Sequence, residues 1–135
     1  MIMLLVSTVG MIMAAFFPTD PLNIPEETMH GKIHQLGATL DLIPFAAIFI
    51  TVNLIRKNER WVCARKMLIG MTVLVWAGEI GFMAAMAIYF PADGKFAPEI
   101  LVGWPSRLTV LFQCLWIFVV AREEIKISNH FAVNR

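Results

Sequence analysis

Four long stretches of apolar side chains constrain the fold of this chain more than any other feature. They cover residues 2–17, 36–55, 67–90 and 100–121 of a chain of 135 residues. A helix rises about 1.5 Å per residue, so about 20 residues cross the roughly 30 Å hydrocarbon core of a bilayer. Each stretch approaches or exceeds that length. The sequence therefore predicts an all-α fold, a four-helix transmembrane bundle that forms a single domain over residues 1–135.

The overall composition supports a membrane environment. Hydrophobic residues make up 59% of the chain and charged residues 16%, and the mean hydropathy is +0.71. A soluble chain of this size would leave much of its apolar surface in water, because small domains bury a limited share of their surface. The formal net charge of +1, without a basic stripe, argues against nucleic acid as a partner. The expected partner is the lipid bilayer.

Basic residues are concentrated at one end of the predicted spans. The connection between the second and third spans contains Arg56, Lys57, Arg60, Arg65 and Lys66, and the fourth span is followed by Arg122, Lys126 and Arg135. The other two connections hold one lysine each. The positive-inside rule therefore places residues 56–66, the tail 122–135 and both termini in the cytoplasm, in an antiparallel up-down topology. A bacterial inner membrane is the expected location.

The start of the first span predicts a retained helix rather than a cleaved signal peptide. It has no basic segment before the apolar run, and residues 13–17 before Pro18 contain no cleavage site of the Ala-x-Ala type. Its abrupt beginning also predicts a longer parent protein with upstream helices.

Prolines and small residues divide the chain further. Prolines at positions 18, 21 and 25 prevent a regular helix, whereas the helical pattern resumes at Met29, with Thr28 or Asn23 as its cap. Pro44 and Pro105 are expected to kink the second and fourth spans. The third span carries a surface of small residues that permits close helix packing: Gly70, Ala77, Gly78, Gly81, Ala84 and Ala85.

Three ionisable residues lie inside the predicted spans, namely Asp41, Glu79 and Arg107. A charge in hydrocarbon costs several kcal/mol unless it faces protein, water or a partner group, so such residues often mark function. Counting helical rise places Asp41 and Arg107 at a similar depth below the outer face and Glu79 near the middle of its span. All three can therefore converge in the outer half of the bundle. Arg107 is expected to pair with Glu79 or Asp41, either to hold helices together or to bind an anionic group. Glu79 is also suited to hold and pass on a proton.

His30, His34 and Asp41 are spaced by four and seven residues, which places them along one helical stripe. The stripe predicts a polar entry from the outer surface into the bundle. Two alternatives remain open. Both histidines can simply bond lipid headgroups at the interface, or the stripe can begin a metal site.

A catalytic zinc site would need a third ligand from Asp20, Asp41 or Glu79. No His-Glu-x-x-His motif is present, and the remaining His130 is predicted on the other side of the membrane. We therefore expect no metal and no other cofactor, with His30, His34 and Asp41 as the only weak metal candidates. An enzymatic role is not the expected one.

Several short segments, in order along the chain, carry a resemblance to a known family. They are Phe17-Pro18-Thr19-Asp20-Pro21, Thr28, Gly31-Lys32-Ile33-His34, Arg60-Trp61, Arg65 and Gly103-Trp104-Pro105-Ser106-Arg107-Leu108. The pattern resembles that of small bacterial multi-pass membrane proteins, the domain of unknown function nine-nine-eight. The resemblance extends from the first span to the fourth.

The resemblance implies six helices, so this chain would lack the first two. Either it would be a truncated or mis-started form, or it would need a partner, another chain or a second copy, over the exposed face. The resemblance covers Asp20, His34 and Arg107, whereas His30, Asp41 and Glu79 are proposed from the residues alone. The family transfers no biochemical role. Our first hypothesis is a protein that binds or passes a small or lipidic ligand through an outward-facing polar pocket. The alternatives are a metal-dependent lipid hydrolase within the membrane and a structural subunit of a membrane complex.

Overall fold

The structure is a computed structural model, and it describes residues 2–17, 20, 28–57, 59–89 and 103–133. These residues form helices and contain no strand. In chain order the elements are α1 (Ile2–Phe16), α2 (Met29–Thr39), α3 (Ile43–Lys57), the short 3-10 helix η1 (Glu59–Trp61), α4 (Arg65–Tyr89) and α5 (Gly103–Val133). The predicted all-α bundle is confirmed.

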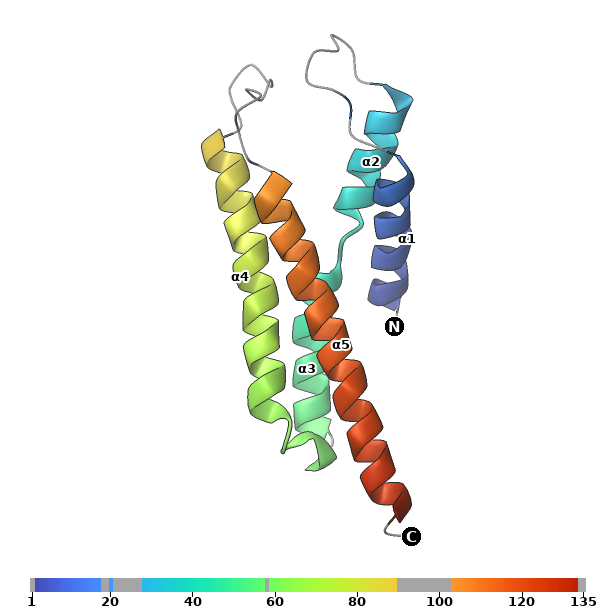
Figure 1. Cartoon of the computed structure of the whole chain (residues 1–135), viewed down its shortest axis with the longest axis vertical. Coiled ribbons are helices and arrows are strands. Elements are labelled where there is room, and N and C mark those ends of the chain that lie inside the picture. The colour runs from blue at the N-terminus through green and yellow to red at the C-terminus, as the bar shows by residue number, and fades with distance from the viewer. Residues whose placement is uncertain (1, 18–19, 21–27, 58, 90–102, 134–135) are drawn as a thin grey trace.

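The two longest helices, α4 and α5, pack against each other, and the other helices lie beside them. Helices α4 and α5 lie side by side and run in opposite directions, while α1 and α2 flank one half of their length and α3 flanks the other half (Figure 1). The basic residues of α3, η1 and the start of α4 gather at the end of the bundle opposite α1 and α2 (Figure 1). Most of the two connections expected on the outer side falls outside the described residues.

The second apolar stretch is not the single helix that the sequence predicted. We expected one helix over residues 36–55 with a kink at Pro44. Instead α2 ends at Thr39 and α3 begins at Ile43, so the segment is interrupted at residues 40–42. Pro44 is the second residue of α3, a position where its missing N–H and fixed φ are compatible with a helix. A continuous helix would force the proline ring against the carbonyl of Leu40.

The backbone at this interruption finds partners within the chain. The N–H of Leu42 donates to the hydroxyl oxygen of Ser7 at 2.7 Å, and the N–H of Ile43 donates to Asp41 Oδ1 at 3.0 Å. The carbonyl of Pro44 accepts a bond from Trp76 Nε1 at 3.0 Å. Irregular backbone at membrane depth is tolerated only when such groups are satisfied, because an unpaired one costs several kcal/mol. Ser7 and Trp76 therefore make the break possible.

Helix α5 also differs from the prediction. Pro105 lies in its first turn and produces no kink within it, and the helix continues unbroken to Val133. The segment from residue 122, which we expected to be a tail after the fourth span, is therefore helical as far as it is described. Glu123 and Lys126 form an ion pair of 2.7 Å on this part of the helix. At 1.5 Å per residue α5 is about 46 Å long, more than the hydrocarbon thickness of a bilayer.

Close helix contacts occur where glycine removes the side chain. A Cβ atom on Gly37 would lie 2.6 Å from the carbonyl oxygen of Gly10, and one on Gly10 would lie 2.5 Å from the carbonyl oxygen of Gly37. These glycines bring the backbones of α1 and α2 together. Gly78 does the same for α4 and α5, as the small-residue surface predicted, since its Cβ would lie 2.8 Å from Phe112. Gly70 and Gly81, two other members of that predicted surface, make no such contact.

The apolar surface is largely turned outward. Buried apolar side chains form two small clusters, one around Trp116 and Val75 and the other around Trp61 and Leu68. Large apolar side chains are exposed on every long helix. Among the described residues, Met29–Lys57 and Arg65–Tyr89 are long and apolar enough to cross a membrane, and Ile2–Phe16 is a shorter apolar helix.

Candidate functional site

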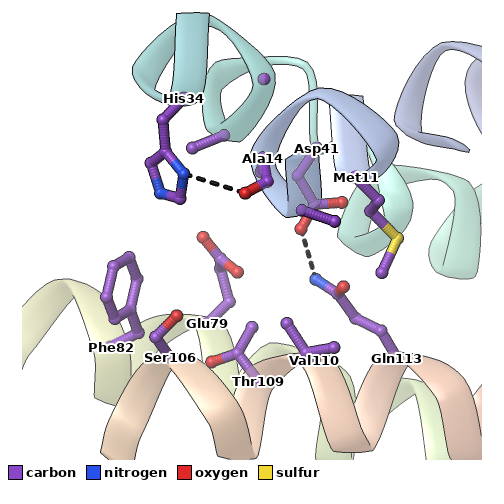
Figure 2. A pocket seen from close by; sticks show the side chains of 13 residues that line it. Met11, Ala14, His34, Asp41, Glu79, Phe82, Ser106, Thr109, Val110 and Gln113 are labelled. Carbon is purple, nitrogen blue, oxygen red and sulfur yellow. Dashed lines mark hydrogen bonds between the residues drawn. The ribbon is translucent and has the colours of Figure 1, made fainter. Parts of the chain in front are cut away.

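A cavity of about 430 Å³ lies where α1 and α2 face α4 and α5 (Figure 2). Its wall contains the polar side chains of His34, Asp41, Glu79, Ser106, Thr109 and Gln113. The rest of the wall is small or apolar and consists of Met11, Ala14, Ala15, Gly37, Ala38, Phe82 and Val110. Several lining residues, Ala38 and Ser106 among them, are exposed, so the cavity is open rather than sealed.

Two carboxyl groups dominate the electrostatics of this cavity. Asp41, at the interruption between α2 and α3, and Glu79, on α4, both line it and are close enough to interact electrostatically. No lysine or arginine is among the described lining residues. The wall is therefore negative or, when protonated, neutral, and it does not offer a cationic group to an anion.

The two acids differ in how they are held. Asp41 accepts a bond from Gln113 Nε2 at 2.6 Å through one oxygen and the Ile43 bond through the other. Glu79 has no hydrogen-bond partner among the described residues, and Figure 2 shows its carboxyl group pointing into the cavity. Both carboxyl oxygens of Asp41 therefore accept hydrogen bonds within the protein, whereas the carboxyl group of Glu79 is available to a ligand.

Gln113 is fully buried and its amide orientation is fixed by Asp41. A carboxylate only accepts hydrogen bonds, so the NH₂ group of Gln113 must face it. The amide oxygen, Oε1, is then left buried without a partner among the described residues. A buried unpaired acceptor costs about 1–3 kcal/mol, so this atom of a cavity-lining residue calls for a donor. The N–H of Trp116, about one turn further along α5, is buried and also lacks a partner among the described residues, but the two groups do not pair with each other.

His34 also has a fixed orientation. Its Nδ1 lies 3.0 Å from the carbonyl oxygen of Ala14 and 2.8 Å from that of Phe17. Both partners are acceptors, so Nδ1 carries the proton, and in the neutral ring Nε2 is an acceptor. The ring joins α2 to the last turn of α1, and Figure 2 shows it on the side of the cavity facing Glu79.

The α5 wall is held by a hydroxyl group. Thr109 Oγ1 lies 3.0 Å from the carbonyl oxygen of Gly78 and 3.0 Å from that of Pro105, so it ties α5 to α4 beside the cavity. Ser106 lines the cavity one turn nearer the start of α5. Residues 106, 109, 110 and 113 therefore define the face of α5 that meets the cavity.

Arg107 corrects the sequence prediction, because it pairs with neither acid. It is exposed, it does not line the cavity, and its guanidinium carbon lies 5.7 Å from the centre of the Trp104 ring. The described residues contain no ion pair between Arg107 and Glu79 or Asp41. The reason is helical phase, since Arg107 lies about 100° around α5 from Ser106.

Asp20 and His30 lie away from the cavity as well. Thr28 is the N-cap residue of α2, as one of the two predicted caps, because its hydroxyl oxygen accepts a bond from the Gly31 N–H. Asp20 holds this cap in place by accepting a bond from the Thr28 N–H at 2.7 Å and another from the Thr28 hydroxyl. His30 packs against Phe17, with ring centroids 5.6 Å apart. The predicted stripe is wrong because α2 ends before Asp41. Of its three members, His34 and Asp41 meet in the cavity and His30 does not.

The hydrogen bonds between Asp20 and Thr28 predict a pH effect on stability. The hydrogen bonds from the Thr28 hydroxyl and N–H, with a smaller attraction from His30, hold the pKa of Asp20 below its ordinary value of 3.8. A lowered pKa stabilises the fold above that value, and the contribution disappears as the pH falls through the folded-state pKa. Thermal denaturation from neutral to acidic pH should therefore show a smaller acid-induced loss in Asp20→Asn than in the wild type. Equal acid sensitivity in both proteins would contradict this role.

No group of three or more histidine, cysteine or acidic side chains in the described part of the chain could hold a metal ion. The two cysteines, Cys63 and Cys114, are exposed and free.

Sequence reasoning missed Gln113, Ser7 and the Gly10–Gly37 contact. Gln113 had a visible signal, because an amide in the middle of an apolar stretch needs a partner as a charge does. Ser7 and the two glycines had none, since their roles depend on how α1 meets the interrupted segment.

The sequence was compared with the patterns of known families, with curated proteins and with solved structures. The sequence pattern of a family described as protein of unknown function (DUF998) matches residues 1–123. Neither the curated proteins nor the solved structures contain a match to the chain. The family match covers most of the 135 residues and includes every residue that lines the cavity. The chain therefore belongs to the DUF998 family, whose function is unknown.

Proposed function

We propose that this chain is a multi-pass membrane protein that binds, or passes across the membrane, a small or lipidic ligand in the cavity between α1–α2 and α4–α5. The observation that carries the proposal is the contrast between the two surfaces of the bundle. The outer surfaces of the helices expose large apolar side chains, whereas the cavity gathers an available carboxyl group and a buried unpaired amide oxygen. Polar groups at membrane depth mark a function by default.

The orientation of the protein follows from its charges. The basic residues of the 56–66 connection lie at the end of the bundle opposite α1 and α2. The positive-inside rule assigns that end to the cytoplasm, so the cavity belongs to the outer half of the membrane. The predictions that both termini face the cytoplasm and that the membrane is a bacterial inner membrane belong to the same proposal.

The interruption of the second apolar segment supports a ligand site. Broken helices in membrane transporters place backbone and helix ends around substrates near the middle of the bilayer, and irregular backbone is tolerated there because it lines a cavity. Residues 40–42 fit this pattern, since Asp41 lies at the break and lines the cavity. No contact in the described residues favours the alternative of a metal-dependent hydrolase.

Accessibility of engineered cysteines tests the proposal. Ala38 lines the cavity, and Cys114 is exposed on α5 outside it. The two lie at similar depth, because Asp41 and Gln113 are hydrogen-bonded across the cavity at 2.6 Å. In membranes, Ala38→Cys on a background without the native cysteines should react with a charged, membrane-impermeant methanethiosulfonate reagent added outside. Cys114 should not react, because its thiol faces lipid.

Cys63 provides the control for orientation. It is exposed at the basic end of the bundle, so it should react only after the membrane is permeabilised. If Ala38→Cys is as unreactive as Cys114, no water-filled cavity reaches that depth and the proposed function fails. Reaction of Cys63 from outside would reverse the orientation.

A further inference from the structure

We infer that the ligand of this cavity carries a primary ammonium group joined to an apolar body. This inference rests on the proposed function and adds the chemical class of the ligand. Three independent features of the wall point to a cationic donor of hydrogen bonds: its charge, its unfilled acceptors and its apolar surface.

The first feature is charge. Glu79 presents a carboxyl group with no hydrogen-bond partner among the described residues. Helix α2 ends at Thr39, so the negative end of its dipole also lies at the cavity, beside Ala38. Asp41 already accepts hydrogen bonds from the Ile43 N–H at the start of α3 and from Gln113, and these bonds partly stabilise its charge. Glu79 is therefore the main partner that we assign to a cation.

The second feature is the set of acceptors. Gln113 Oε1 is buried and unpaired, and the neighbouring Asp41 fixes it in that orientation. In the neutral ring of His34, Nε2 is an acceptor, because Nδ1 donates to backbone carbonyl oxygens. An anion would bring more acceptors and leave these atoms unpaired. An N–H-bearing cation would supply the missing donors.

The third feature distinguishes an organic cation from a metal ion. The described residues lack a cluster of three metal-binding side chains, whereas Met11, Phe82 and Val110 give the cavity an apolar side. The Phe82 ring can also face a cation with its π surface. A volume of about 430 Å³ is at the small end of the range for ligand pockets, about 300–1,000 Å³. The wall thus fits a small amphiphilic amine.

The test uses the Ala38→Cys protein described above. Its reaction rate is measured with a trimethylammonium and with a sulfonate methanethiosulfonate reagent, each divided by the rate of that reagent with a free thiol in solution. We expect the cationic reagent to react at least about tenfold faster, which corresponds to about 1.4 kcal/mol. In Glu79→Gln the preference should fall severalfold, whereas Glu59→Gln, which removes an exposed acid outside the cavity, should leave it unchanged.

Competition identifies the ligand class directly. 2-Phenylethylammonium should protect Ala38→Cys from the reagent, and neutral 2-phenylethanol and anionic 3-phenylpropanoate should not. Protection in nanodiscs that contain phosphatidylethanolamine, compared with phosphatidylglycerol alone, would assign the same ammonium site to a lipid headgroup.

The possible failures are distinguishable. Equal rates for both reagents, or protection by the neutral or anionic compound as strong as by the ammonium, would overturn the inference and leave the cavity and the proposed function standing. A thiol that reacts with neither reagent would overturn both. The comparison of reagents on Ala38→Cys needs no substitution at Glu79, so it remains decisive if that variant fails to fold.

Discussion

Replacing Gly37 with alanine should separate α1 from α2 and lower the free energy of unfolding by about 3 kcal/mol, the upper part of the range for overpacking. The added Cβ would lie 2.6 Å from the carbonyl oxygen of Gly10 and 2.9 Å from the amide nitrogen of Ala14. Both atoms belong to a helix backbone, so neither can rotate away as a side chain can. Thermal denaturation of the detergent-solubilised protein, followed by size-exclusion chromatography, measures the effect.

Gly70→Ala is the matched control for this substitution. Gly70 also lies within a helix, and a Cβ built on it meets no atom within 4 Å. Alanine there should leave the melting temperature unchanged or raise it slightly, because alanine favours helix over glycine. If Gly37→Ala behaves like Gly70→Ala, the close approach of α1 and α2 described above does not exist. Ala14 and His34 would then not form the wall of the cavity in the arrangement described above.

Asp41→Ala should cost about 3 kcal/mol or more, because hydrogen bonds to a charged group contribute about 1.5–3 kcal/mol each. The substitution removes the acceptor for the Ile43 N–H and the partner of Gln113 together. Asp41→Asn should cost less, since its amide oxygen can still accept the bond from Ile43. The same thermal assay compares the two variants.

A double-mutant cycle with Gln113→Leu isolates the contact across the cavity. Once leucine replaces Gln113, Asp41→Ala no longer leaves a buried NH₂ group without a hydrogen-bond acceptor. The loss in free energy of unfolding caused by Asp41→Ala should therefore be smaller by about 1–3 kcal/mol. Additive costs would mean that Asp41 and Gln113 do not interact. The structural role assigned to Asp41 would then reduce to the Ile43 bond.

The helices could be predicted from the sequence where apolar length alone decides them. Four stretches near membrane-spanning length predicted the all-α bundle, and the observed bounds of α1 and α4 differ from the expected ones by few residues. The interruption at residues 40–42 could not be predicted in this way. A proline inside an apolar stretch is compatible with a kink or a break, and the partners that permit the break, Ser7 and Trp76, come from distant parts of the chain.

The residues of the candidate site, too, could be predicted from the sequence only in part. Asp41, Glu79 and His34 do line one cavity, as depth along the spans suggested, because ionisable groups within apolar helices turn toward the protein interior. Arg107 had the same signal and turns away. Depth fixes how far a residue lies along a helix, whereas the face on which it lies depends on the packing of α5 against α4, which Gly78 and Thr109 set.

An experimental structure in lipid nanodiscs, determined with and without 2-phenylethylammonium, tests the central claim most directly. We predict a cavity between α1–α2 and α4–α5 in which the Glu79 carboxyl group contacts density for the ammonium, with Gln113 and His34 within reach. A Glu79 side chain turned toward lipid, or a cavity closed by direct packing of α2 on α5 in both samples, would contradict the account.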